Sequence, residues 1–157
     1  AFQLMEQVSG RAGRKKEQGK VIIQATNVKH PVLQLVQQHD YKLFYNLEIE
    51  NRKQFFYPPY SRIVLLTLKH KDKNIVTSAA EKLANLLKQD LKDLMVGPAA
   101  PVVNRIRNQY LMEILIKLPK EPGMSIKYKA AIRNHINLVT GEKSFKSVTV
   151  IADVDKM

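Results

Sequence analysis

The hydrophobic pattern of the first third of the chain predicts short elements separated by loops. Residues 1–9 have a helical spacing of apolar positions that ends at Gly10. The glycines and charged residues of 10–19 indicate a loop. Residues 21–25 form a short apolar run that is typical of a buried strand.

Two amphipathic segments follow, at residues 31–38 and 40–55, and both predict helices. Pro31 suits a first helical position and Asp40 suits an N-cap. The Tyr-Pro-Pro-Tyr sequence at residues 57–60 ends the second helix, because proline cannot donate a backbone hydrogen bond and restricts the residue before it. We therefore expect three parts: residues 1–29, residues 30–60 as a helical linker, and residues 61–157 as a C-terminal domain.

In the rest of the chain, segments whose apolar residues are spaced as in a strand alternate with segments whose apolar residues are spaced as in a helix. The predicted order is a strand at 63–69, a helix at 72–94, strands at 102–107 and 110–118, a helix at 125–139 and a strand at 146–154. Gly97-Pro98 is expected to close the first helix, and a tight turn near Asn108 and Gln109 to join the middle strands. This order is typical of a ferredoxin-like βαββαβ sandwich, an α+β fold with both helices on one face of a four-stranded antiparallel sheet.

The chain has a large excess of positive charge. Its 26 lysines and arginines face 14 acidic residues, for a net charge of +12. Such a surplus is costly unless an anionic partner relieves it, and nucleic acid is the commonest partner of this kind. The alternative is an ordinary basic surface on a soluble protein.

Several classes of site are excluded or disfavoured. The chain has no cysteine, which excludes disulfides and thiolate metal sites and fits a cytoplasmic location. Its histidines are widely separated, so no metal site is expected. No apolar run is long enough for a membrane span. Ala1 is not an initiator methionine and residues 2–5 have the pattern of a helix interior, so we expect a C-terminal piece of a longer protein.

Residues 7–14 carry the most specific motif, Q-x-x-G-R-x-G-R, with Gln7, Gly10, Arg11, Gly13 and Arg14 as its defined positions. Glycine lets a backbone turn tightly and lets a phosphate approach closely. Arginine stays charged and donates in a fork to phosphate oxygens. An arginine placed at a departing γ-phosphate can stabilise the charge that develops there. The alternative is a basic surface loop.

This string resembles the last conserved motif of superfamily 2 helicases. The resemblance implies that residues 1–29 are the end of the second of two RecA-like helicase lobes, and that Gln7, Arg11 and Arg14 face the ATP cleft between these lobes. Arg11 and Arg14 would be the catalytic arginine fingers, and Gln7 with the two glycines would contact the nucleotide. A phosphate-binding G-x-x-x-x-G-K-[S/T] loop and a metal-binding Asp-Glu pair are absent from the sequence, so this chain alone is not expected to hydrolyse ATP.

Further motifs narrow the resemblance to the PriA family of bacterial replication-restart helicases. They are G-K-V-I-I-Q-A-T at 19–26, H-P-V at 30–32, Y-P-P-Y-S-R at 57–62, G-P-A at 97–99 and D-V-D at 153–155. The resemblance implies a parent protein that uses ATP with Mg2+ to move 3′ to 5′ along DNA, and that holds zinc outside this chain. The implied partners are forked and single-stranded DNA, single-stranded DNA-binding protein, and primosome and helicase-loading proteins, with no membrane.

Basic residues near the predicted strand pair and second helix are candidates for binding nucleic acid or a partner. They are Arg105, Arg107, Lys117, Lys127, Lys129 and Arg133. Tyr110 could add a stacking ring. The resemblance implies that the acidic tip of single-stranded DNA-binding protein binds near residues 125–133. The alternative is a solvated face.

A second hypothesis is a free-standing nucleic-acid- or protein-binding module without motor activity. A sheet of the RNA-recognition type usually carries paired aromatic residues on its central strands. Here the central-strand candidates are aliphatic: Val64, Leu66, Ile114 and Ile116. This composition counts against the second hypothesis.

Overall fold

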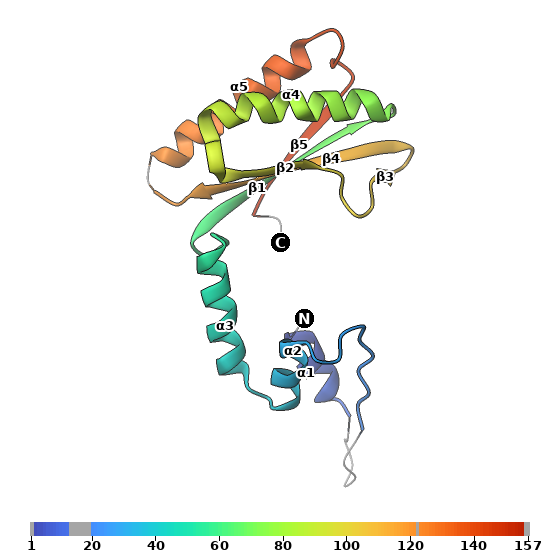
Figure 1. The fold of residues 1–157 in the computed structure, drawn as a ribbon, viewed down its shortest axis with the longest axis vertical. Helices are drawn as coiled ribbons and strands as arrows, with labels where there is room; N and C mark the ends of the chain where they lie inside the picture. Colours follow the sequence, from blue (N-terminus) through green and yellow to red (C-terminus); the bar gives the residue numbers. More distant parts are fainter. Residues whose placement is uncertain (1, 13–19, 122, 156–157) are drawn as a thin grey trace. The chain divides into compact units, whose positions relative to one another are not determined.

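The computed structural model describes residues 2–12, 20–121 and 123–155, apart from the side chain of Ser125. Figure 1 shows the order of the elements. They are α1 (Phe2–Ser9), α2 (Pro31–Gln37), α3 (Tyr41–Gln54), β1 (Ser61–His70), α4 (Lys73–Leu91), the 3-10 helix η1 (Lys92–Leu94), β2 (Met95–Ala99), β3 (Arg105–Ile106), β4 (Gln109–Pro119), α5 (Met124–Gly141) and β5 (Thr149–Val154). The chain divides into two compact units, Ala1–Asn51 and Arg52–Met157.

The N-terminal unit is built from α1, α2 and most of α3. The predicted helices are confirmed, with Pro31 in the first turn of α2. The Oδ1 atom of Asp40 accepts a hydrogen bond from the Leu43 backbone N–H at 2.8 Å, which caps α3 as expected. A small apolar cluster of Phe2, Leu35 and Val36 holds the unit together.

The strand predicted at residues 21–25 is wrong. These residues pair with no strand of the described chain, and the side chain of Ile22 is 93% exposed. A strand needs hydrogen-bonding partners along its edge, and the apolar pattern alone cannot provide them.

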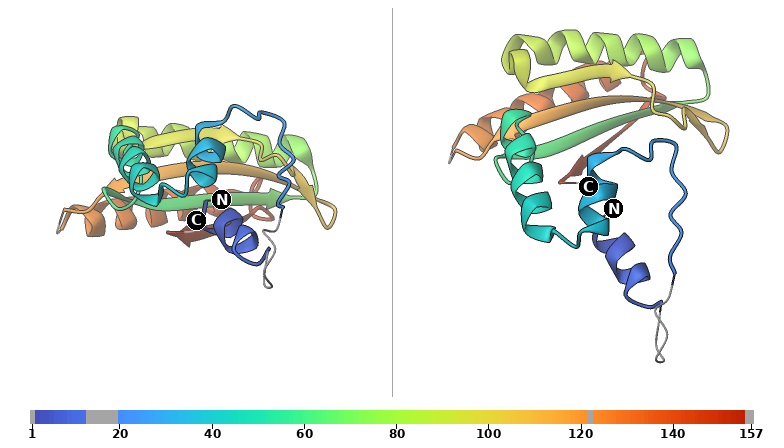
Figure 2. Two further views of the ribbon diagram at one scale, coloured as in Figure 1. Left: turned by 90° about the horizontal axis from the view of Figure 1, so that it is seen from below. Right: turned by 60° about the horizontal axis from the view of Figure 1, so that its bottom comes forward.

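The C-terminal unit is a mixed helix and antiparallel-sheet structure, so the predicted α+β class is confirmed. The sheet order is β2-β4-β1-β5, and the short β3 pairs with β4. β1 lies between β4 and β5, which confirms the prediction that this strand is central. Both α4 and α5 cover the same face of the sheet (Figures 1 and 2).

The main hydrophobic core lies between this sheet and the two helices. Leu66 and Ile114 are paired neighbours on β1 and β4, and both are fully buried beneath the helices. On α4 the apolar stripe expected from the sequence is buried as well, including Ala80, Leu83 and Leu87. The Asp72 carboxylate caps α4 by accepting from the backbone N–H groups of its first turn, at 2.7 and 3.3 Å.

The strand predicted at residues 102–107 is misplaced. The second strand along the chain is β2 (Met95–Ala99), and only Arg105–Ile106 pair within the predicted range. Gly97-Pro98 lies inside β2, where a register irregularity falls between Val96 and Ala99. The expectation that Gly97-Pro98 closes the preceding helix is therefore wrong, because α4 ends at Leu91 and η1 at Leu94. An edge strand with an irregularity tolerates both glycine and proline.

Gly97 has a structural reason to be glycine. Its φ is +108°, and a Cβ atom at this position would lie 2.8 Å from the backbone oxygen of Glu113 on β4. Only a residue without a side chain allows the two strands to approach this closely.

Candidate arginine motif and nucleic-acid interface

The arginine motif begins inside α1, at Gln7, and its next residues continue the helical turn. Backbone hydrogen bonds run from Gly10 to Glu6 at 2.8 Å and from Arg11 to Val8 at 3.2 Å, so the helical turn extends past Ser9. Gln7 and Arg11 are one helical turn apart and both are exposed. Gly13 and Arg14, the other two positions of the motif, lie outside the described residues.

The helix that presents Arg11 is fixed on its opposite side. The ring of Phe2 stacks on Phe44 with centroids 4.7 Å apart. The Glu6 carboxylate lies 2.6 Å from Nδ1 of His39, a contact that ties α1 to the turn between α2 and α3. The outward side of α1 also carries Leu4 and Val8, which are mostly exposed. Gln7 and Arg11 therefore lie on a partly apolar surface on the side of α1 away from these contacts.

The candidate nucleic-acid residues fall into three separate groups. The first group lies at the β3–β4 turn, where the Arg105 guanidinium lies over the Tyr110 ring at 4.9 Å and bonds to the Asn108 side chain. Arg107 and Asn108 form the turn itself, both with positive φ. The expected tight turn is therefore confirmed, one residue earlier than predicted.

Lys117 forms the second group, at the other end of β4. Its ammonium lies 3.9 Å from the centroid of the Tyr57 ring and donates to the Phe55 carbonyl at 2.8 Å. At roughly 3.3 Å of rise per residue, Lys117 is about 23 Å from Tyr110 along the strand. Lys117 is thus engaged in holding the segment before β1, and it does not share a surface patch with Arg105.

The third group lies on α5. Lys127, Lys129 and Arg133 are exposed on this helix, which contains no acidic residue. Lys129 and Arg133 line an open cleft of about 270 Å3 between α5 and the end of β5. Apolar side chains form the rest of this cleft: Val64, Ile132, Ile136, Ala152 and Val154.

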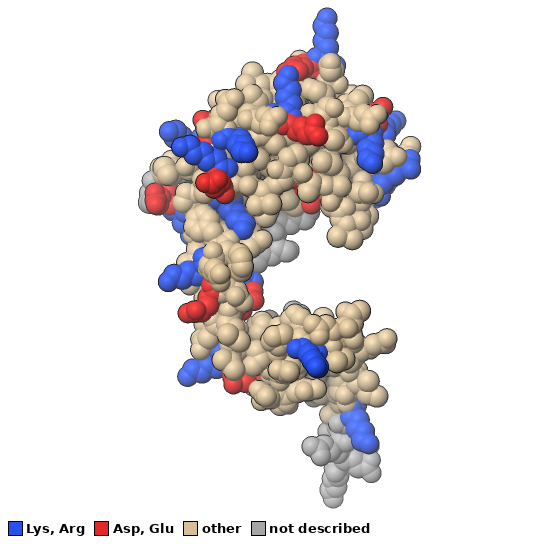
Figure 3. Space-filling model, viewed as in Figure 1, with Lys and Arg blue, Asp and Glu red and all other residues tan. Residues whose placement is uncertain are grey.

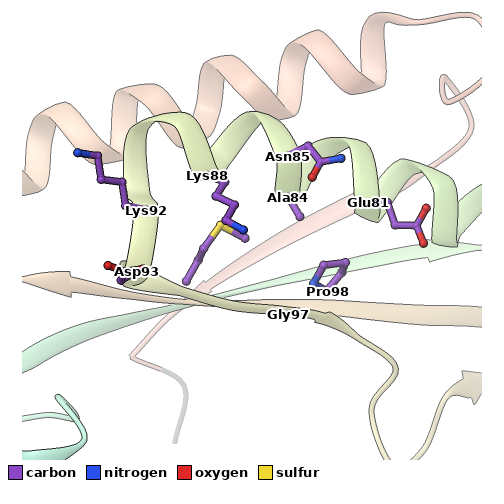
Figure 4. A pocket seen from close by; sticks show the side chains of 9 residues that line it. Glu81, Ala84, Asn85, Lys88, Lys92, Asp93, Gly97 and Pro98 are labelled. Atoms are coloured by element: carbon purple, nitrogen blue, oxygen red, sulfur yellow. The ribbon is translucent and has the colours of Figure 1, made fainter.

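A larger cleft was missed by the sequence analysis. It has a volume of about 480 Å3 and lies between α4 and the free edge of β2 (Figure 4). Its lining includes Glu81, Asn85, Lys88 and Lys92 from one side of α4 and η1, together with Gly97 and Pro98. The only signal in the sequence is the helical spacing of the polar residues, because β2 itself was not predicted.

Several acidic side chains of the C-terminal unit make local contacts. Glu142 pairs with Lys82 at 2.6 Å and Asp90 with His135 at 2.7 Å. The Asp155 carboxylate accepts from the Ile63 backbone N–H at 3.1 Å. In the view of Figure 3, lysine and arginine side chains lie in several groups around this unit and form no single continuous patch.

The face of the sheet opposite the helices has few aromatic residues on its central strands. The side chains of Val64, Leu66, Ile114 and Ile116 belong to the core on the helix side of the sheet, so they lie away from this face. Leu65 and Leu115 are paired neighbours on the other face, and both are aliphatic. The stacking platform of an RNA-recognition sheet is therefore absent from β1 and β4.

The described residues contain no group of three histidines and carboxylates that could hold a metal ion. None of the described helices is both long and apolar enough to cross a membrane.

These features define a basic α+β domain preceded by a helical unit that carries an arginine motif. The family model of the primosomal protein N C-terminal domain matches residues 53–157, and the chain belongs to this family. It is 37% identical over 136 residues to the replication restart protein PriA of Bacillus subtilis, and 38% identical over 120 residues to that of Synechocystis. These alignments cover 85% and 75% of the chain, but only 17% and 14% of the two relatives.

Proposed function

We propose that this chain is the C-terminal part of an ATP-dependent 3′-to-5′ DNA helicase that restarts stalled replication forks. The observation that carries the proposal is the family match over residues 53–157, directly after a helical unit with the arginine motif. The relatives named as replication restart proteins align across both units of the chain. By itself the chain is inactive as an ATPase, because it has no phosphate-binding loop.

In this proposal Arg11 and Arg14 act on ATP and Mg2+ held by an upstream lobe. Support comes from the side of α1 that faces away from its own core. This side exposes Gln7 and Arg11 next to Leu4 and Val8, as expected of a surface that a second lobe covers.

The C-terminal unit is assigned to the ferredoxin-like class. The strand order β2-β4-β1-β5, with both helices on one face, supports this assignment. Since that fold serves many functions, its role here is argued from its surface.

That surface supports binding to forked and single-stranded DNA and to protein partners. Arg105 and Arg107 lie on a hairpin and can contact phosphates. The cleft between Lys129 and Arg133 has an apolar floor, which suits a peptide with acidic and apolar residues. The acidic tip of single-stranded DNA-binding protein has this chemistry, and primosome and helicase-loading proteins are further partners. Zinc belongs to other parts of the parent protein.

The motor role is tested by changing Arg11→Ala in the full-length protein. An arginine finger contributes roughly a thousandfold or more to phosphoryl transfer, so DNA-stimulated ATP turnover should fall by about that factor. Affinity for forked DNA should change little. The matched control is Lys20→Ala, an exposed cation just beyond the motif, which should leave turnover unchanged. Normal ATP hydrolysis by the Arg11→Ala variant would refute the arginine-finger role.

A further inference from the structure

The loop before β3 and the β3–β4 hairpin form an ordered projection. The Leu111 backbone N–H donates to the Asn104 carbonyl at 2.9 Å, which ties the loop to β4. Arg105 pairs with Tyr110 and Ile106 with Gln109 across the hairpin. The loop leaves the sheet on the side opposite α4 and α5 (Figures 1 and 4). Within the C-terminal unit, neither α4 nor α5 covers this projection.

The projection exposes apolar side chains although its backbone is held in place. Val102 is fully exposed, Val103 is 61% exposed and Ile106 is 50% exposed, whereas Leu111 at the base of the loop is buried. Single exposed apolar residues are ordinary, but three within five residues on an ordered loop make a patch. A patch of this kind is typical of a surface that meets a partner.

The charge around these side chains indicates the class of partner. The sequence contains no acidic residue between Asp93 and Glu113, while Arg105 and Arg107 lie within the hairpin. The Arg105 guanidinium is held over the Tyr110 ring and bonded to Asn108, so its position is defined in advance. An anionic partner with an apolar, stackable component matches this combination, and DNA has both properties.

We propose that residues 101–108 act as a wedge that unstacks the terminal base pair at a DNA branch point. Val102 and Val103 insert against the base pair, and Arg105 and Arg107 hold the flanking phosphates. Proteins that open base steps combine apolar wedges with cationic phosphate contacts in this way. The proposal rests on the proposed function, since it requires that the C-terminal unit acts on forked DNA.

The experiment uses the whole chain and a forked DNA with 2-aminopurine at the first paired position, a base whose fluorescence rises when it is unstacked. A fully paired duplex of the same sequence is the reference. We expect the chain to raise the fluorescence of the fork and to leave that of the duplex unchanged. The double variant Val102→Ser/Val103→Ser should keep its affinity within about threefold, because phosphate contacts dominate affinity, but should lose most of the rise.

The matched control is Val96→Ser, which changes a valine that is 58% exposed on β2, outside the projection. It should retain the full fluorescence rise. The variant Arg105→Gln/Arg107→Gln should lower the salt dependence of fork binding, with the slope falling by about 1 for each lost phosphate contact. Circular dichroism checks that each variant is folded.

The outcomes separate the wedge from the proposed function. If the chain binds the fork without a fluorescence rise, or if the double serine variant retains the rise, the wedge is wrong and the helicase assignment stands. The wedge is also wrong if the fully paired duplex shows the same rise. If the chain binds neither DNA, its proposed use on DNA fails, and the wedge fails with it.

Discussion

The two compact units differ in how completely they bury their own apolar residues. In the C-terminal unit a continuous core extends across β1, β4, α4 and α5. Among the described residues of the N-terminal unit the buried cluster consists of Phe2, Leu35 and Val36, and none of the residues of α3 is buried. The C-terminal unit therefore has the core of an independent domain, whereas the N-terminal unit leaves many of its described apolar side chains exposed.

This difference has a direct consequence for cooperativity. A helix that buries none of its residues gains little from tertiary packing, and packing supplies most helical stability in proteins. Equivalent changes in the two units should therefore have unequal effects on unfolding of the chain.

The largest expected difference concerns the cores. Leu83 on α4 is fully buried, so Leu83→Ala should lower the free energy of unfolding of the C-terminal unit by about 3 kcal/mol, from lost apolar contacts and the cavity left behind. The comparison is Leu43→Ala on α3, where the side chain is 43% exposed and the loss should stay below about 0.5 kcal/mol. Urea denaturation followed by circular dichroism measures both. Equal losses would contradict the contrast between the units.

A smaller difference in stability is expected when one glycine in each unit is replaced by alanine. Gly97→Ala places a Cβ against the Glu113 carbonyl at an unfavourable φ, and should cost about 2 kcal/mol. Gly10 follows α1 in the other unit, and a Cβ there would make an ordinary contact with Glu6 at 3.4 Å. Gly10→Ala should therefore leave the melting temperature of the chain nearly unchanged in calorimetry. A melting temperature that is unaffected by Gly97→Ala would show that β2 can move away from β4 without loss.

The smallest difference concerns the helix caps. Asp72 and Asp40 accept backbone hydrogen bonds of similar length, 2.7 and 2.8 Å, at the starts of α4 and α3. Asp72→Ala should destabilise the packed α4 by about 1 kcal/mol. Asp40→Ala should instead increase amide hydrogen exchange in the first turn of α3, with little change in global stability. If Asp40→Ala destabilised the chain as much as Asp72→Ala, α3 would belong to the cooperative core.

Elements in which the apolar residues are regularly spaced were predicted well. The apolar stripe of α4 and the alternation along β4 reproduce the structure to within a few residues, because each of these patterns is matched by burial on one face. The prediction failed where the pattern was short or interrupted. Residues 21–25 have the composition of a strand but no partner in the described chain, and β2 contains the Gly97-Pro98 pair, which was interpreted as the end of the preceding helix.

The sequence by itself determined the family motifs, the excess of positive charge and most of the helices and strands, because these depend on residue type and local spacing. Only the tertiary structure decided which basic residues are neighbours. It separated Arg105, Lys117 and Lys129 onto different surfaces and placed the exposed side chains of Val102 and Val103 on the loop before β3. The physical reason is that side-chain neighbours in a sheet are set by strand pairing between distant segments, and local periodicity carries no information about that pairing.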